Sequence, residues 1–236
     1  MKFVIDKADS RGHFDYGWLN TYHTFSFADY HNPERINFGA LRVLNDDTVA
    51  PGKGFGMHPH KNMEVVSIPL QGYLRHGDSV KNERTIVPGE IQVMSTGSGI
   101  FHSEYNESMT EILKFLQIWI VPKVVNTPPE YHNYDIRPLL KHNELRTFIS
   151  PEVGETPAHL LQDAWFSSGS FDAGQKVTYR LHKKNTGVYV FVLDGSICVQ
   201  GMHLSSRDGI GMWEMEEIAI ESISDSSILA IEVVIQ

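Results

Sequence analysis

The sequence feature that most constrains the fold is a pair of short motifs, each with two metal-binding residue types one position apart. His58 and His60 form the first pair, and His102 and Glu104 form the second. On a β-strand, residues two apart point to the same face, whereas on a helix they do not face each other. Both motifs therefore favour strands, with each pair directed to one side of a sheet.

The segments beside these pairs are typical of β-strands. The run Glu64–Leu70, after the first pair, is rich in β-branched residues and ends before Gly72. The run Ile91–Met94 and a turn of small residues, Ser95–Gly99, precede the second pair. If the two strands lie side by side, the pairs converge on a site with three imidazoles and one carboxylate. Nitrogen and oxygen ligands without a thiolate suit Fe, Mn, Cu, Ni or Zn.

Longer motifs in the same region resemble known families. Two spacings are similar to the first and second motifs of cupin proteins: Gly52-x5-His58-x-His60-x3-Glu64, followed by Gly72, and Gly89 … His102-x3-Asn106. More narrowly, the phrases HPHKNME, GIFHSEYN and HTFSFADYHNP resemble the pirin family, whose bacterial members include quercetin 2,3-dioxygenases. The resemblance covers most of the chain and is densest in residues 9–122.

Two departures from the general cupin pattern bear on the carboxylate ligand. Gly72 falls one residue late, and Ser95 stands where a proline is usual, with two extra residues before His102. In the general pattern the carboxylate would be Glu64, whereas pirins use the residue two after the second-motif histidine, which here is Glu104. The resemblance and the spacing both predict one ligand set: His58, His60, His102 and Glu104. The expected cofactor is one divalent transition metal per chain, iron first, with Mn, Cu, Ni, Co or Zn as alternatives.

Short β-like runs recur about every ten residues, with turns that contain Gly or Pro, as is typical of an all-β barrel or sandwich. Residues 182–195 weakly repeat residues 60–72, which indicates duplication of one β unit. The ligand pairs do not repeat. We therefore predict an all-β fold of two tandem cupin (jelly-roll) β-barrels, a bicupin. The expected divisions are a metal-binding domain at 1–122, a proline-containing linker at 123–138, and a degenerate cupin domain without metal ligands at 139–236.

Aromatic and polar residues outside the ligand set are candidates for a substrate pocket. His23, Phe25 and Phe27 would share one face of a strand, either as a core cluster or as a wall of the pocket. Gln117 would lie opposite an aliphatic stripe on its own strand. It is interpreted either as a hydrogen-bonding group beside the ligands or as solvent-facing.

Two other polar segments are interpreted as turns or surface. The cluster Asn45–Asp47 has the composition of a turn. His76, near a glycine and several charged residues, is interpreted as a turn or surface residue rather than a further ligand.

Composition restricts the class of partner. The net charge of −9 makes broad electrostatic binding to nucleic acid or to an anionic membrane unexpected. The single cysteine, Cys198, cannot form an internal disulfide, and the first residues lack the apolar run of a secretory signal. No apolar run approaches the roughly 20 residues that span a bilayer. The expected location is the cytoplasm.

The resemblance to pirin quercetinases implies an activity. It implies oxidative opening of the flavonol heterocycle with release of carbon monoxide, at a metal whose four protein ligands leave positions open for substrate and dioxygen. In this hypothesis Glu104 is also the catalytic proton acceptor. The alternative is a non-enzymatic, metal-dependent redox sensor or regulatory protein of the pirin type, with a protein partner. A third hypothesis is an isomerase or lyase on the same fold.

Overall fold

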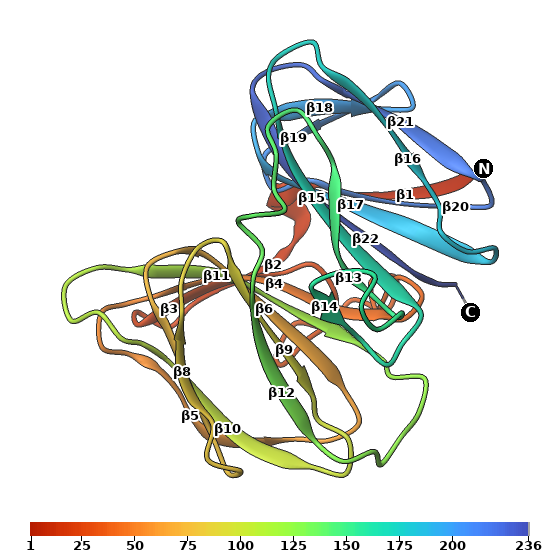
Figure 1. Cartoon of the computed structure of the whole chain (residues 1–236). Helices are drawn as coiled ribbons and strands as arrows, with labels where there is room; N and C mark the ends of the chain where they lie inside the picture. The colour runs from red at the N-terminus through yellow and green to blue at the C-terminus, as the bar shows by residue number, and fades with distance from the viewer. Residues whose placement is uncertain (236) are drawn as a thin grey trace.

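The computed structural model describes residues 1–235, whose regular secondary structure is almost entirely β-strand and is arranged in two lobes (Figure 1). One short 3₁₀ helix, η1 (Ala8–Ser10), is also present. The strands form two seven-stranded and two four-stranded sheets. Each lobe combines one large and one small sheet, as in a cupin barrel. The predicted all-β bicupin fold is confirmed. In the described residues, no helix is long and apolar enough to cross a membrane.

The first lobe carries the predicted metal ligands. Its large sheet has, from edge to edge, the strands β12 (Glu130–Asp135), β9 (Glu90–Ser95), β6 (Glu64–Gln71), β11 (Leu113–Ile120), β4 (Leu41–Val49), β3 (Leu19–His23) and β2 (Gly12–Asp15). Its small sheet has the strands β5 (Gly54–His60), β10 (Ile100–Asn106), β7 (Leu74–Asp78) and β8 (Glu83–Ile86).

The second lobe repeats this arrangement. Its large sheet has the strands β1 (Lys2–Asp6), β20 (Gly209–Trp213), β17 (Thr186–Asp194), β22 (Ser226–Val234), β15 (Ala164–Phe171), β13 (Arg146–Ser150) and β14 (Ala158–His159). Its small sheet has the strands β16 (Lys176–Arg180), β21 (Glu217–Ser222), β18 (Ser196–Val199) and β19 (Met202–Ser205).

Two segments lie elsewhere than the sequence predicts. Strand β1 pairs with β20, so the chain starts in the second lobe and crosses to the first through η1 (Figure 1). Strand β12 pairs with β9 along six residues, so the predicted linker at 123–138 is wrong for this part. The prolines of that segment, Pro128, Pro129 and Pro138, flank the strand instead of interrupting it. A proline outside the ladder removes none of its hydrogen bonds.

The largest apolar core lies between the two lobes. Because alternate residues of a strand face opposite sides, each large sheet turns one face to this shared core and the other to its own barrel interior. The buried residues of the shared core come from both lobes and include Leu44, Leu116, Ile118, Phe166, Phe191 and Ile231.

The central row of the second barrel's large sheet is apolar. Val190 of β17 pairs with Ala230 of β22 and Ile210 of β20, and all three belong to one buried cluster. This row of the second barrel is therefore packed by apolar side chains.

The matching row in the first barrel is polar. Ser67 of β6 pairs with Gln117 of β11 and Gln92 of β9, and the row continues through Asn45 of β4 to His23 of β3. All five residues are buried. The two barrels thus share one architecture, but this row of the large sheet is polar in the first barrel and apolar in the second.

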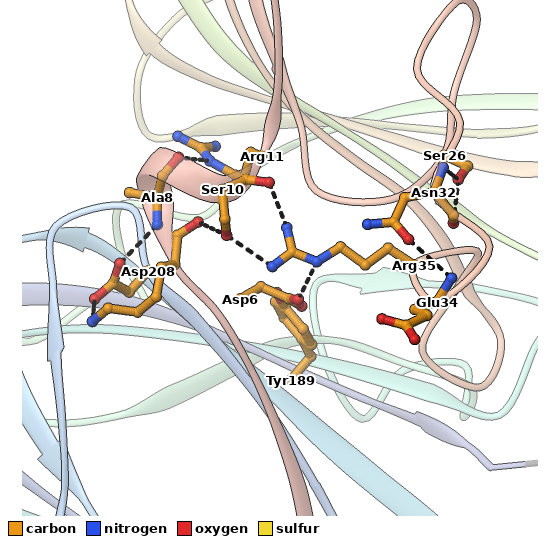
Figure 2. Close-up of polar contacts among 11 residues, drawn as sticks. Asp6, Ala8, Ser10, Arg11, Ser26, Asn32, Glu34, Arg35, Tyr189 and Asp208 are labelled. Atoms are coloured by element: carbon orange, nitrogen blue, oxygen red, sulfur yellow. Dashed lines mark hydrogen bonds and ion pairs between the residues drawn. The ribbon is translucent and has the colours of Figure 1, made fainter.

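A polar cluster fixes the crossing of the chain between the lobes (Figure 2). Arg35 Nε lies 3.0 Å from a carboxylate oxygen of Asp6, and the Tyr189 hydroxyl donates to the same carboxylate at 2.8 Å. The backbone N–H of Ala8 donates to Asp208 at 2.8 Å. Burial raises the pKa of Asp6, although the Tyr189 hydrogen bond and the Arg35 charge act in the opposite direction. The cluster ties β1 and η1 to the second lobe.

Candidate metal centre

Three histidines from two neighbouring strands form a compact group in the first lobe. His58 and His60 lie on β5, and His102 lies on the antiparallel strand β10, directly opposite His58. One ring nitrogen from each lies within 4.8 Å of the others. Within residues 1–235, no other set of three or more His, Cys, Asp or Glu side chains is gathered so closely. The structure brings the three predicted histidines together.

Hydrogen bonds show which ring nitrogens face the centre of this group. His58 Nδ1 lies 2.7 Å from the Gly56 carbonyl oxygen, to which it donates, so its Nε2 carries a lone pair. The Nε2 atoms of His60 and His102 are buried and have no hydrogen-bond partner. Buried polar atoms are nearly always partnered. These unpartnered nitrogens therefore fit a bound transition metal, which imidazole ligates through a lone pair.

Burial keeps the rings in the form that binds a metal. Desolvation lowers the pKa of His60 to about 4, and His58 acts in the same direction. Desolvation also lowers the pKa of His102 to about 2, with further lowering by neighbouring histidines. Both rings are therefore neutral at pH 7, and a metal does not have to displace a proton from them.

Glu104 lies in the same cavity and is held by two hydrogen bonds. It follows His102 at the next inward position of β10, although a bulge shifts the register between them. Ser67 Oγ donates to Oε1 at 3.0 Å, and Gln117 Nε2 donates to Oε2 at 2.6 Å. Burial raises the pKa of Glu104 to about 7, against the lowering effect of these two bonds. Its carboxylate lies outside the compact histidine group, so its role as fourth ligand stays a prediction.

Glu64, the carboxylate of the general cupin pattern, is engaged elsewhere. Its Oε2 accepts hydrogen bonds from Ser95 Oγ at 2.9 Å and from the backbone N–H of Leu161 at 3.2 Å. It is not among the residues that line the cavity. Its contacts therefore favour Glu104 for the ligand role.

A cavity of about 710 Å³ opens beside the histidines. Trp119 forms part of its wall and packs edge-on against His60, with ring centroids 4.7 Å apart, and against Phe27 at 5.3 Å. The cavity has the size and the aromatic lining of a site for a small organic molecule. Its polar wall comes from Thr21, His23, Asn45, Asp47 and Gln117.

Of the four predicted pocket residues, three line the cavity and one does not. His23, Phe27 and Gln117 are in the wall. The prediction for Phe25 is wrong, because β3 ends at His23 and the alternation of faces ends with it. Phe25 is buried in the core between the lobes, 5.7 Å from the Tyr189 ring. For Gln117, its bond to Glu104 decides between the two interpretations in favour of the hydrogen-bonding role.

Sequence reasoning missed the polar residues of β4. Asn45 and Asp47 lie inside this nine-residue strand, not in a turn, and both are 3% exposed. Thr21 Oγ1 donates to Asp47. Burial raises the pKa of Asp47 to about 7, in part offset by the Thr21 hydrogen bond. A signal was present, since the spacing of Asn45 and Asp47 is the same as that of the ligand pairs.

His76 was also missed. It lies on β7 and is 0% exposed, so its interpretation as a turn or surface residue is wrong. Its Nδ1 is 3.4 Å from Nδ1 of His102, and its Nε2 is 3.2 Å from Asp78 Oδ2. The spacing of His76 and Asp78 is again that of two residues on one face of a strand.

Comparison with known proteins agrees with this geometry. Residues 4–120 match the family model Pirin, and residues 147–233 match the model of the quercetinase C-terminal cupin domain. A quercetin 2,3-dioxygenase of Escherichia coli (strain K12) is 37% identical over 225 residues, which are 95% of this chain and 96% of that protein. A pirin-like protein of Caulobacter vibrioides is 36% identical over 235 residues, 97% of this chain and 99% of that protein.

A solved structure has the same fold. The crystal structure of the bacterial pirin YhhW of Escherichia coli in complex with nickel(II) superposes with a TM-score of 0.94 at 35% identity, and the match covers 100% of both chains. Similarity of this extent, over both lobes, identifies the family. The chain therefore belongs to the pirin family.

Proposed function

We propose that the chain is a metal-dependent dioxygenase that opens the heterocyclic ring of flavonols such as quercetin and releases carbon monoxide. The observation that carries this proposal is the histidine group, with its free nitrogens, at an aromatic-lined cavity of about 710 Å³. Relatives that bear the name quercetin 2,3-dioxygenase along nearly the whole chain support the same activity.

Four side chains would hold one divalent transition metal, with iron the first candidate: His58, His60, His102 and Glu104. When bound, such a metal lowers the pKa of a coordinated hydroxyl and supplies the redox chemistry with dioxygen. The donor set of nitrogen and oxygen atoms suits this class of metal, and the unpartnered Nε2 atoms of His60 and His102 are the structural sign of it.

The cavity walls would bind and orient the flavonol. Trp119 and Phe27 pack against each other at right angles beside His60, so their apolar surfaces border the histidine group. A flat polyphenol can stack or pack edge-on against such rings, while its oxygens reach the histidine group. The rings of Trp119 and Phe27 would also exclude water from the reacting atoms.

Glu104 would accept the proton of the flavonol 3-hydroxyl. Burial raises its pKa to about 7 in the metal-free cavity, and a bound cation would favour the ionised form, which can accept a proton. Gln117 and Ser67 hold one oxygen each. Gln117 in turn accepts a hydrogen bond from Trp119 Nε1 at 3.1 Å, so the base is oriented by the same residue that would pack against the substrate.

An aerobic assay with quercetin tests the proposal. Protein loaded in turn with Fe, Mn, Co, Ni, Cu or Zn should remove the long-wavelength absorbance of quercetin and form one carbon monoxide for each dioxygen consumed. Chelation should abolish the activity, and added metal should restore it. His58→Ala should be inactive, while Glu64→Gln should retain activity as the matched control. If no metal supports turnover, the dioxygenase is rejected in favour of the metal-dependent sensor.

A further inference from the structure

A buried pair of side chains lies behind His102, on the side of the ring opposite its free Nε2. His76 and Asp78 both lie on β7, the neighbour of β10, and both side chains are 0% exposed. The three residues form a chain: Nδ1 of His102 is 3.4 Å from Nδ1 of His76, and Nε2 of His76 is 3.2 Å from Asp78 Oδ2. This chain leads from the histidine group to a carboxylate.

The positions of the protons along this chain follow from one requirement. For Nε2 of His102 to offer a lone pair to a metal, its proton must be on Nδ1. That N–H then donates to Nδ1 of His76, which must be the acceptor. The remaining proton of His76 is therefore on Nε2, where it donates to Asp78. With these assignments, each N–H group of His102 and His76 in this relay meets an acceptor.

Two further features hold His76 and Asp78 in place. Tyr131 of β12 stacks on the His76 ring, with centroids 4.1 Å apart and an angle of 18° between the planes. Asp78 also accepts the backbone N–H groups of Val80 and Asn82, at 3.0 and 2.9 Å, through its other oxygen. Oδ1 thus organises the turn after β7, while Oδ2 faces His76 and also accepts from Asn82 Nδ2 at 2.8 Å. No such relay serves His58, whose Nδ1 donates to a neutral backbone carbonyl.

We propose that His76 and Asp78 are positioning residues that set the protonation and the orientation of the His102 ring for metal binding. Partners of this kind, one step removed from a metal, typically raise metal affinity by about 10- to 100-fold. The anionic end of the chain also makes the His102 ring a stronger electron donor than a ring bound only to a carbonyl oxygen.

Two substitutions of His76 separate hydrogen bonding from packing. His76→Phe keeps a ring against Tyr131 but removes both hydrogen bonds, and it should weaken cobalt(II) affinity by about 10- to 100-fold in a competition titration. In His76→Gln, the amide can accept from His102 and donate to Asp78 in the same direction, so affinity should stay within about threefold of the wild type. An unchanged affinity in His76→Phe, or an equal loss in both variants, would overturn the proposal.

A surface pair provides the control. His142 lies 2.9 Å from Asp172, and both side chains are more than half exposed. His142→Phe should leave cobalt(II) affinity unchanged, because this pair touches no predicted ligand.

A direct measurement on the unaltered protein does not depend on how the variants fold. In zinc-loaded protein labelled with nitrogen-15 histidine, long-range proton–nitrogen spectra identify the protonated nitrogen of each ring. We expect His76 to be protonated at Nε2 and His102 at Nδ1. Protonation of His76 at Nδ1, or at both nitrogens, would contradict the relay.

Discussion

At the scale of the residue, burial acts in opposite directions on the two kinds of titratable group in the cavity. It lowers the pKa of His23 to about 4, as it does for His60. It raises the pKa of Asp47 and of Glu104 to about 7. Both effects favour the neutral form. Without a metal, the cavity therefore carries little charge, and ionisation of its carboxyl groups is easiest when a cation is bound.

Asp47 should reduce the stability of the metal-free protein as the pH rises. Its pKa of about 7 in the fold lies above the ordinary value of 3.8, so the folded state binds the proton more tightly than the unfolded state. Protonated Asp47 therefore contributes fully to the free energy of unfolding below about pH 4, and this contribution is lost as the pH rises through 7. Between pH 5 and pH 8 this loss lowers the free energy of unfolding by about 3 kcal/mol.

Asp47→Asn, which can still accept from Thr21, should therefore gain about 3 kcal/mol relative to the wild type between pH 5 and pH 8. Urea unfolding with a chelator present measures this difference at the two pH values. Asp9→Asn, at an exposed position on η1, is the control and should change little. A difference between Asp47→Asn and the wild type that does not vary with pH would contradict the assignment.

The two candidate carboxylate ligands can be compared directly. Glu104→Gln should weaken metal binding by at least about 10-fold, because it removes an anionic oxygen from the cavity. Glu64→Gln should stay within about threefold, since Glu64 bonds to Ser95 and Leu161 instead. Equilibrium competition with a chelator of known affinity gives both values. If Glu64→Gln has the larger effect, the ligand role passes to Glu64.

Which site residues could be predicted from sequence depended on local alternation. The pairs His58/His60 and His102/Glu104 could be found because residues two apart share a face of a strand. Asp47 has the same spacing from Asn45, but the run Asn45–Asp47 also has the composition of a turn, and only its cross-strand partners show that it lies in a buried strand. Phe25 was misplaced because nothing local indicates that β3 ends at His23.

At the scale of the element, β12 is the strand that sequence reasoning could least anticipate. A strand at the edge of a sheet depends on a partner that is distant in sequence, here β9, and its prolines suggested a linker. Its importance lies in Tyr131, which covers the His76 ring. The fold class, by contrast, could be predicted because turns at regular intervals are visible along the whole chain.

Tyr131→Ala should affect both the stability and the metal site. Loss of the partly buried ring should cost about 3 kcal/mol in the free energy of unfolding and should lower metal affinity, because it uncovers His76. Tyr131→Phe should resemble the wild type, since the hydroxyl donates only to the neighbouring Asn133. Denaturant unfolding and metal titration measure the two effects. Unchanged metal affinity in Tyr131→Ala would mean that β12 contributes only packing.

At the scale of the whole molecule, the shared core makes the two lobes interdependent. The second lobe lacks a close group of metal-binding side chains within the described residues, yet its large sheet covers one face of the sheet that carries Gln117. The weak internal repeat predicted two barrels, but it could not predict that their largest apolar cluster lies between them. That contact joins residues far apart in sequence.

Ile231→Ala tests this interdependence from the lobe without the histidine group. Ile231 is 0% exposed in the shared core, so its truncation should cost about 2–5 kcal/mol. Metal release from the first lobe and calorimetric unfolding should shift to lower temperature together, in one transition. Ile223→Ala, at a position 46% exposed, is the control and should shift neither. Metal release that stays at the wild-type temperature would show that the lobes unfold independently.

The place of β1 in the second lobe also has a consequence for how the protein is made. Ala8 finds its partner Asp208 200 positions later in the chain. At about 5–20 residues per second of synthesis, the segment leaves the ribosome roughly 10–40 seconds before that partner exists. During this interval β1 has no sheet to join, and its apolar residues Phe3 and Val4, which stay 50% and 39% exposed even in the finished fold, are open to any other strand edge. Strand β1 is therefore made long before its partner β20, and until then the charge of Lys2 opposes its pairing with another strand edge.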